Sequence, residues 1–306
     1  MARPDAEPLT SRRSLLFVPG AEPRKLERAR EAGADTLLFD LEDSVAPAQK
    51  AEARVHVAAA LRAGGFGRAE AAVRVNAPGS EHFEADVEAV LASGGHTIML
   101  PKAETAAGVA AAVEVLRTLA RSCGGAGDAR LLLLIESPAG IADAVAVGRA
   151  APRVEALCFG HADFSLQMGL DDADAARGVA YHARCTLAIA ARACGVAPID
   201  SVFLAVRDEA AFREDAALGY RLGFDGKLCI HPRQVEIVNE VYTPRAEQVD
   251  YAMRVVEAWE RAAAEGRGVF ALDGRMIDGP VVAVQRRVLE RARRAGVLGT
   301  SGVKRV

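Results

Sequence analysis

Short apolar runs alternate with helix-like stretches along most of the chain, and this alternation restricts the fold more than any other feature. Eight runs fit strands, at 14–18, 36–41, 71–75, 97–100, 131–135, 156–159, 199–203 and 226–230. Helical patterns follow them, at 22–32, 47–63, 83–92, 105–121, 138–149, 179–194, 208–218 and 232–241. Several runs, above all 131–135, are apolar at both odd and even positions, as strands covered on both faces are. The pattern predicts an α/β protein with a (β/α)8 barrel of the TIM type.

A doubly wound open sheet is the alternative fold. It would need an edge strand more polar than any of the eight runs.

The pattern changes after Val241. The stretch that follows reads as one long amphipathic helix, a small strand and turn, and a final helix. It is too short to be expected to form an independent core. We therefore expect a barrel domain over 12–243 and a C-terminal helical extension over 244–306, which packs on the barrel or on a neighbouring subunit.

Composition excludes several classes of protein. A net charge of −3 and a pI near 6.1 argue against nucleic-acid binding, and no apolar run is long enough for a membrane span. The five cysteines form no C-x-x-C pair and indicate reduced thiols. The RRSLLF segment resembles a twin-arginine signal, but charged residues and proline follow it at once. These features predict a cytoplasmic protein.

Acidic side chains follow two of the apolar runs. Glu136 ends LLLLIES and Asp163 lies in ALCFGHADF. In a (β/α)8 barrel the chemistry lies at the carboxyl ends of the strands, and a desolvated carboxylate is costly unless a cation receives it. Two carboxylates suit Mg²⁺ or Mn²⁺, while Arg74 in VRVN suits a carboxylate or phosphate. The sequence therefore predicts a pocket for an oxygen-rich anion that chelates a divalent ion. Other polar residues at the same strand ends are Asp40, Glu42, Asp43, Asn76, Lys102, His161, Asp200 and His231.

Simpler roles exist for these residues. Glu136 and Asp163 could serve the N-termini of the helices that follow them. Arg74 could form an ion pair with Asp40 or Glu42 at the rim of the barrel. Zinc is not expected, because no cluster of His and Cys has ligand spacing.

Eight ordered motifs extend this interpretation: RRSLLFVPG, FDLEDSVAPAQKAEAR, VRVN, IMLPKAE, LLIESPAGI, FGHADFSLQMGL, GKLCIHPRQV and DGRMIDGPVV. With them the chain, from about Arg12 to Arg294, resembles the citrate-lyase beta-subunit-like branch of the HpcH/HpaI aldolase superfamily, most closely the malyl-CoA and citramalyl-CoA lyases. The resemblance implies a barrel with a C-terminal lid that assembles as trimers or hexamers. It also implies Mg²⁺ and the cleavage or formation of a carbon–carbon bond between an acyl-CoA and a 2-oxo acid such as glyoxylate or pyruvate.

The resemblance assigns roles to individual residues. It implies that Glu136 and Asp163 are the metal ligands, that Arg74 holds the substrate carboxylate and that Phe17 lines the pocket. Asp278, in MID, is implied to be the general base and to reach a neighbour's barrel from the lid.

One position departs from the family pattern. Relatives often carry an arginine two residues after the PG of the first motif, where it meets a CoA phosphate, but this chain has Glu22 there. We expect Arg24, Lys25 or Arg28 on the same helix to replace it.

Three alternatives to a malyl-CoA or citramalyl-CoA lyase remain. The first is a citrate lyase beta subunit acting on an acyl-carrier-protein thioester. The second is a class II aldolase for free 4-hydroxy-2-oxo acids, favoured by Glu22 and disfavoured by the MID segment. The third is an inactive barrel that serves assembly, which is weakened by the joint presence of Arg74, Glu136, Asp163 and Asp278.

Overall fold

The computed structural model describes residues 11–123, 129–170 and 176–298. The chain separates into two compact units: one spans Arg12–Glu240, and the other includes the chain from Val241 onward.

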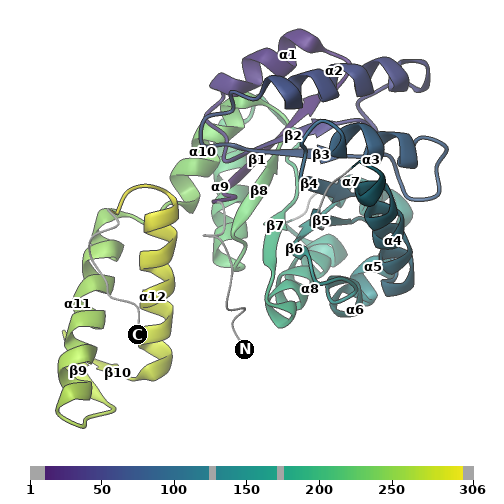
Figure 1. Ribbon diagram of the computed structural model, residues 1–306. Coiled ribbons are helices and arrows are strands. Elements are labelled where there is room, and N and C mark those ends of the chain that lie inside the picture. The colour runs from purple at the N-terminus through teal and green to yellow at the C-terminus, as the bar shows by residue number, and fades with distance from the viewer. Residues whose placement is uncertain (1–10, 124–128, 171–175, 299–306) are drawn as a thin grey trace. The chain divides into compact units, whose positions relative to one another are not determined.

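Eight parallel strands close into a barrel in the first unit (Figure 1). Leu15 of the first strand pairs with Thr36 of the second and also with Leu228 of the eighth, so the sheet has no free edge. The predicted TIM barrel is confirmed, and the open sheet is wrong. The strands are β1 (Ser14–Pro19), β2 (Thr36–Asp40), β3 (Glu70–Arg74), β4 (Thr97–Leu100), β5 (Arg130–Ile135), β6 (Val154–Phe159), β7 (Ala197–Asp200) and β8 (Gly226–Cys229).

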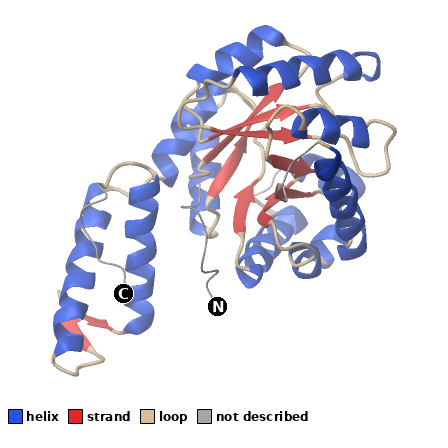
Figure 2. Ribbon diagram, in the orientation of Figure 1, coloured by secondary structure: helices blue, strands red, loops and turns tan. Residues whose placement is uncertain are grey.

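Helices surround these strands, as Figure 2 shows in blue around red. They are α1 (Pro23–Arg28), α2 (Lys50–Ala63), α3 (Phe83–Leu91), α4 (Ala106–Ser122), α5 (Pro138–Ala142), α6 (Ala144–Gly148), α7 (His161–Gln167), α8 (Gly178–Cys194), α9 (Glu209–Arg221) and α10 (Pro232–Tyr242), with 3₁₀ turns at Ala29–Glu31 and Pro47–Gln49. Within the described residues, no helix has both the length and the apolar character needed to cross a membrane.

The barrel interior is filled by apolar side chains at alternate strand positions. Leu15, Leu38, Ala72 and Leu134 belong to one buried cluster to which all eight strands contribute. Because side chains alternate along a strand, the residues two positions further on face the same interior, nearer the carboxyl-terminal mouth. This periodicity directs Phe17, Asp40, Arg74 and Glu136 into the mouth of the barrel.

The amino-terminal end of the barrel is closed by a polar layer. Arg12 donates two hydrogen bonds to Glu70, at 2.7 and 2.8 Å. Glu70 also accepts from the hydroxyl of Thr97 at 2.9 Å and from that of Thr36 at 3.3 Å. Burial opposes the charge of Glu70, yet the hydrogen bonds and the charge of Arg12 hold its pKa below the usual value. This layer seals the end of the barrel opposite to the mouth.

The second unit has a core of its own, contrary to the expectation from its length. Helices α11 (Ala246–Ala264) and α12 (Gly279–Arg294) join through a hairpin of β9 (Phe270–Leu272) and β10 (Arg275–Ile277). Both helices are amphipathic, and their apolar faces share one buried cluster that includes Val255, Ile277 and Leu289. The hairpin turns at Asp273 and Gly274, both with positive φ.

Two local predictions in the barrel are wrong, and one helix was not predicted. The strand predicted at 199–203 ends at Asp200, whose carboxylate pairs with Arg184 and Lys227. The helix predicted at 138–149 is divided at Asp143 into α5 and α6. Helix α7 was not predicted, because its 7 residues are too few for a helical period of apolar positions to be visible.

Candidate active site

The acids and the arginine predicted from the strand ends meet at the carboxyl-terminal mouth of the barrel. Arg74 is the last residue of β3, and Glu136 directly follows β5. Asp163 lies in the first turn of α7, which begins two residues after β6 ends. Its charge acts on both Glu136 and Lys102, which places it in the same cluster.

Arg74 is held by carboxylates of the β2 end and the loop that follows. Its Nε and Nη2 each donate to one oxygen of Asp40, both at 2.7 Å. Its Nη1 donates to Asp43 at 3.2 Å and lies 3.1 Å from Glu42 Oε2. Burial opposes the charge of Asp40, but the hydrogen bonds from Arg74 hold its pKa below the usual value. The rim ion pair considered from the sequence is therefore present.

Phe17 lies against this arginine. The guanidinium carbon is 4.7 Å from the centroid of the Phe17 ring, a cation–π distance. Phe17 also packs against the apolar cluster of the barrel interior. The ring therefore supports Arg74 from the side of the core.

Glu42 is a member of the site that sequence reasoning did not select. Its side chain is 7% exposed, and neither carboxylate oxygen accepts a hydrogen bond within the part of the chain that the structure describes. Burial raises its pKa to about 7, although the charge of Arg74 opposes the rise. In the sequence Glu42 is one of several acids between Asp40 and Asp43, and its burial is not evident there.

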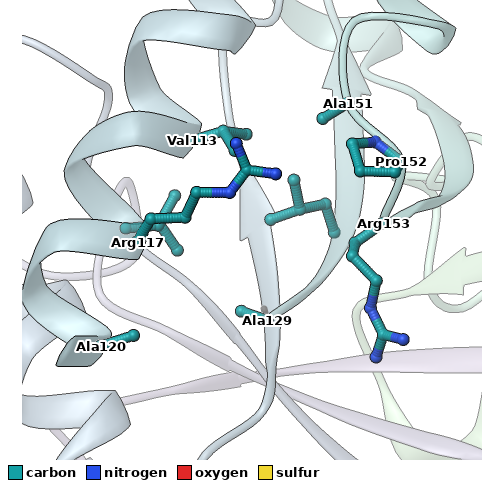
Figure 3. Close-up of a pocket in the computed structure, with 9 residues that line it drawn as sticks. Val113, Arg117, Ala120, Ala129, Ala151, Pro152 and Arg153 are labelled. Carbon is teal, nitrogen blue, oxygen red and sulfur yellow. The ribbon is translucent and has the colours of Figure 1, made fainter. Parts of the chain in front are cut away.

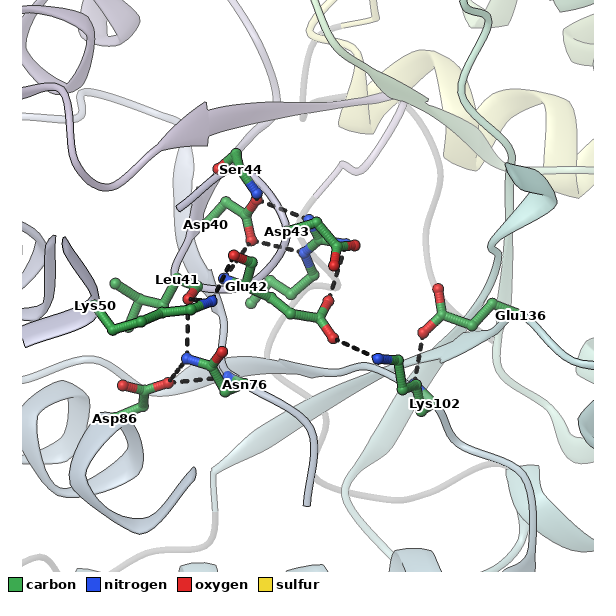
Figure 4. A network of polar contacts seen from close by, with 11 residues as sticks. Asp40, Leu41, Glu42, Asp43, Ser44, Lys50, Asn76, Asp86, Lys102 and Glu136 are labelled. Carbon is green, nitrogen blue, oxygen red and sulfur yellow. Dashed lines mark hydrogen bonds and ion pairs between the residues drawn. The ribbon is translucent and has the colours of Figure 1, made fainter. Parts of the chain in front are cut away.

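Glu136 faces Glu42 across the mouth (Figure 4). One of its oxygens, Oε1, accepts from the backbone N–H of Lys102 at 2.7 Å. Burial and the charge of Glu42 raise its pKa to about 8. Two buried acids with raised pKa values at the mouth of the barrel mark a candidate functional site.

The side chains of Lys50 and Asn76 hold the loop that carries Glu42. The buried ammonium of Lys50 donates to the carbonyl oxygens of Leu41, at 2.8 Å, and of Glu42, at 2.6 Å. The side chain of Asn76 also donates to Leu41 O, at 2.9 Å, and to Asp86 at 2.6 Å. Figure 4 shows these contacts beneath the acidic cluster. The acids are therefore held by a rigid support rather than by a free loop.

Asp278 belongs to the second unit. It is the N-cap of α12, where its carboxylate accepts from the N–H of Val281 at 3.1 Å. The role predicted for it stays a prediction.

The basic residues expected to meet a CoA phosphate lie on α1. Arg24 and Arg28 are exposed, and neither side chain forms an ion pair with another described residue. Lys25 instead pairs with Glu22 at 2.6 Å. Of the three candidates, Arg24 and Arg28 are the two with an available charge.

A separate apolar pocket lies away from this mouth (Figure 3). It lies between α4 and the amino-terminal ends of β5 and β6, with Arg117 and Arg153 among its lining residues. Catalysis in (β/α)8 barrels occurs at the opposite, carboxyl-terminal end of the strands. The acids at the mouth, and not this pocket, form the candidate active site.

Comparison with known proteins identifies the family. The model of the HpcH/HpaI aldolase/citrate lyase family matches residues 13–232. The chain belongs to this family. As a member of the HpcH/HpaI aldolase/citrate lyase family, it is a carbon–carbon lyase.

Relatives in this family match nearly the whole chain. Citrate lyase subunit beta of Escherichia coli K12 is 40% identical over 94% of this chain and 95% of its own length. L-malyl-CoA/beta-methylmalyl-CoA lyase of Cereibacter sphaeroides ATCC 17029 is 33% identical, over 89% and 92%. The crystal structure of CitE from Mycobacterium tuberculosis with magnesium, acetoacetate and coenzyme A is 32% identical, with a TM-score of 0.74, over 92% of this chain and 98% of CitE.

The acids of this family member fit a hard divalent cation. Within the described residues no three His, Cys, Asp or Glu side chains already form a metal cage. Mg²⁺ does not require one, because it binds through one or two carboxylates and keeps water or substrate oxygens as further ligands. The buried oxygens of Glu42 accept no hydrogen bond from a described residue and are therefore available to a cation or to water bound by it.

A substitution at Gly160 tests the close packing between this residue and Glu136. A Cβ at this position would lie 2.4 Å from Glu136 Cβ and 2.8 Å from Glu136 Oε2. We expect Gly160→Ala to lower the free energy of unfolding by about 1–3 kcal/mol, because Glu136 must shift. Denaturant unfolding measures this, with Gly268→Ala as the control, since nothing lies within 4 Å of that position. Equal stability of the two variants would contradict the close packing.

Proposed function

We propose that this chain is a Mg²⁺-dependent lyase that cleaves or forms a 3-hydroxyacyl-CoA thioester of the malyl-CoA or citramalyl-CoA type. The products of cleavage are an acyl-CoA and a 2-oxo acid such as glyoxylate or pyruvate. The observation that carries the proposal is the excess of buried carboxylates at Glu42 and Glu136 beside the fixed guanidinium of Arg74. This arrangement suits a cation together with an anionic, oxygen-rich ligand.

Glu136 and Asp163 are the residues that would hold the ion, which is Mg²⁺ or, by the same ligand preference, Mn²⁺. When bound, such an ion polarises the carbonyl of a 2-oxo acid and stabilises negative charge on the same oxygen during cleavage. The magnesium in the M. tuberculosis CitE complex supports this choice of metal.

Arg74 is suited to hold the carboxylate of the 2-oxo acid. A guanidinium has five N–H donors, and three hydrogen bonds to Asp40 and Asp43 use three of them. Two donors remain, one each on Nη1 and Nη2, which is the number that a bidentate carboxylate accepts. Asp40 and Phe17 fix the plane of the fork, so little rotamer entropy is lost when the ligand binds.

Cleavage requires two proton transfers: one proton leaves the 3-hydroxyl group, and one is added to the α-carbon. In cleavage, the base removes the proton of the 3-hydroxyl group, the C–O bond becomes a carbonyl and the C2–C3 bond breaks. Its electron pair passes to the α-carbon of the acyl thioester, which is then protonated. We propose Asp278 as this base. The likeness to family enzymes supports this role, and also an assembly of three or six chains in which Asp278 serves a neighbouring barrel.

Coenzyme A is the proposed thioester carrier. Arg24 and Arg28 provide exposed positive charges on α1 for its phosphates, in place of the arginine that Glu22 replaces. The coenzyme A bound to M. tuberculosis CitE, 32% identical to this chain, supports the assignment.

A second candidate is a citrate lyase beta subunit that acts on an acyl-carrier thioester. The 40% identity with the E. coli subunit favours it, since the malyl-CoA lyase is 33% identical. The two candidates share the same acids and arginine, and they differ in the carrier that presents the thioester.

A substrate panel distinguishes these candidates. The purified chain is incubated with Mg²⁺ and malyl-CoA, citramalyl-CoA, citryl-CoA, citryl-carrier protein or a free 4-hydroxy-2-oxo acid, and products are identified by mass spectrometry. Glyoxylate or pyruvate together with an acyl-CoA, lost on chelation of the metal, supports the first candidate. Cleavage of the carrier thioester alone supports the second. Cleavage of the free acid alone contradicts both.

The Arg74→Lys variant tests the carboxylate contact. We expect KM for the 2-oxo acid in the condensation direction to rise about tenfold or more, because an ammonium is a point charge and cannot reproduce the fork. Steady-state kinetics with glyoxylate and pyruvate measures KM and kcat separately. Arg207→Lys, an exposed residue of the loop after β7, is the control. An unchanged KM in Arg74→Lys would remove the proposed role.

A further inference from the structure

Lys102 contacts both buried acids of the mouth, Glu136 and Glu42. Its backbone N–H donates to Glu136 at 2.7 Å, and its ammonium nitrogen lies 3.6 Å from Glu42 Oε1 (Figure 4). The backbone of Lys102 is left-handed, with φ of 54°. For a residue with a Cβ this conformation is unfavourable. It persists at a site where it directs the N–H toward one acid while the side chain extends toward the other.

The contact between Lys102 and Glu42 is a weak one. At 3.6 Å it is an ion pair without a hydrogen bond, and Glu42 accepts no hydrogen bond from any other described residue. The two partners also differ in burial, since the Lys102 side chain is 52% exposed and that of Glu42 is 7% exposed. The ammonium can therefore leave toward water, whereas the carboxylate cannot.

We propose that the Lys102 ammonium is a placeholder for the divalent cation: it pairs with Glu42 while the metal is absent and withdraws into solvent when the metal binds. The proposal rests on the proposed metal site and adds a residue that regulates its occupancy. The hydrogen bond from the Lys102 backbone to Glu136 is kept throughout, because it does not involve the side chain.

The pair between Lys102 and Glu42 is expected to weaken metal binding. An ammonium and a divalent cation repel each other strongly when both lie within a few ångströms of the same partly buried acids. Metal binding to the wild-type protein must therefore break the pair between Lys102 and Glu42. Removal of the ammonium should strengthen metal binding by the free energy of that pair.

Isothermal titration of metal-stripped protein with MgCl2 measures this effect. We expect Lys102→Asn to lower the Kd for Mg²⁺ by about fivefold, the value of a half-exposed ion pair. Asparagine tolerates the left-handed backbone and keeps the N–H that reaches Glu136. Lys102→Gly is the second variant, since glycine adopts positive φ without strain. Lys102→Arg keeps the charge and should not tighten binding.

Two controls separate a placeholder from a general effect of charge. Arg207→Asn removes a positive charge from the loop after β7 and should leave the Kd unchanged. A double-mutant cycle with Glu42→Gln removes the partner of the ammonium, so in that background Lys102→Asn should no longer tighten binding.

The titration tests the metal site and the role of Lys102 separately. No heat of Mg²⁺ binding to the wild type would contradict the proposed metal site itself. Wild-type binding that neither Lys102→Asn nor Lys102→Gly tightens would overturn the placeholder alone. An equal gain in the Glu42→Gln background, or in Arg207→Asn, would show that Lys102 acts only through its long-range field, and would also overturn it.

Discussion

Turnover of the proposed lyase is expected to fall by about 10²- to 10³-fold in a Glu136→Gln variant. The amide has nearly the shape of the carboxylate and can still accept the hydrogen bond from the Lys102 backbone. It carries no charge, however, and is a poor ligand for a hard cation. Kinetics at saturating thioester, measured over a Mg²⁺ titration, should show both the lower kcat and a weaker dependence on Mg²⁺.

Glu104→Gln is the matched control for this variant. Glu104 is an exposed acid on the same loop as Lys102, two residues further along the chain. Its removal changes the net charge at the mouth by the same amount and should alter kcat by less than about twofold. Wild-type turnover and an unchanged Mg²⁺ titration in Glu136→Gln would place the metal ligands elsewhere.

An Asp278→Asn variant is expected to lose about 10²- to 10⁴-fold in kcat, the usual contribution of a general base. The substitution is well suited to the structure, because Asp278 is the N-cap of α12 and asparagine caps a helix as well as aspartate does. The fold of the second unit should therefore be preserved. Mg²⁺ affinity should also be preserved, which separates this variant from Glu136→Gln.

Asp273→Asn provides the comparison within the same unit. Asp273 occupies the β9–β10 turn with φ of 50°, before Gly274, and asparagine followed by glycine is favoured in such turns. This variant should keep wild-type turnover. Activity in Asp278→Asn equal to that of Asp273→Asn would exclude Asp278 as the base.

The barrel was predictable from the sequence because each strand is short, apolar and separated from the next by a helical pattern. The residues of the mouth were predictable because side chains alternate along a strand. Arg74 and Glu136 lie two positions beyond buried core residues of their strands and so face the same interior. The division at Asp143 and the added helix α7 were not predictable, because elements of one or two turns leave no periodic signal.

The environment of Glu42 could not be derived from the sequence. Its neighbours in the chain, Asp40, Leu41 and Asp43, indicate only an acidic segment near a helix start. Its burial depends on Lys50 and Asn76, which hold the loop through backbone carbonyls, a contact that leaves no residue-specific pattern. For Arg74 both sequence interpretations are compatible, since the rim ion pair leaves two donors for a ligand.

The Arg12–Glu70 layer lies at the end of the barrel opposite to the mouth, so this contact maintains the fold at a distance from the residues proposed to perform the chemistry. A buried, hydrogen-bonded pair of this kind is costly to break from one side, by about 3–5 kcal/mol. Loops at the far rim are not bound by that constraint and can accept substitutions while the strands stay in register. A barrel sealed in this way can acquire new substrate preferences through gradual loop changes without first losing its ability to fold.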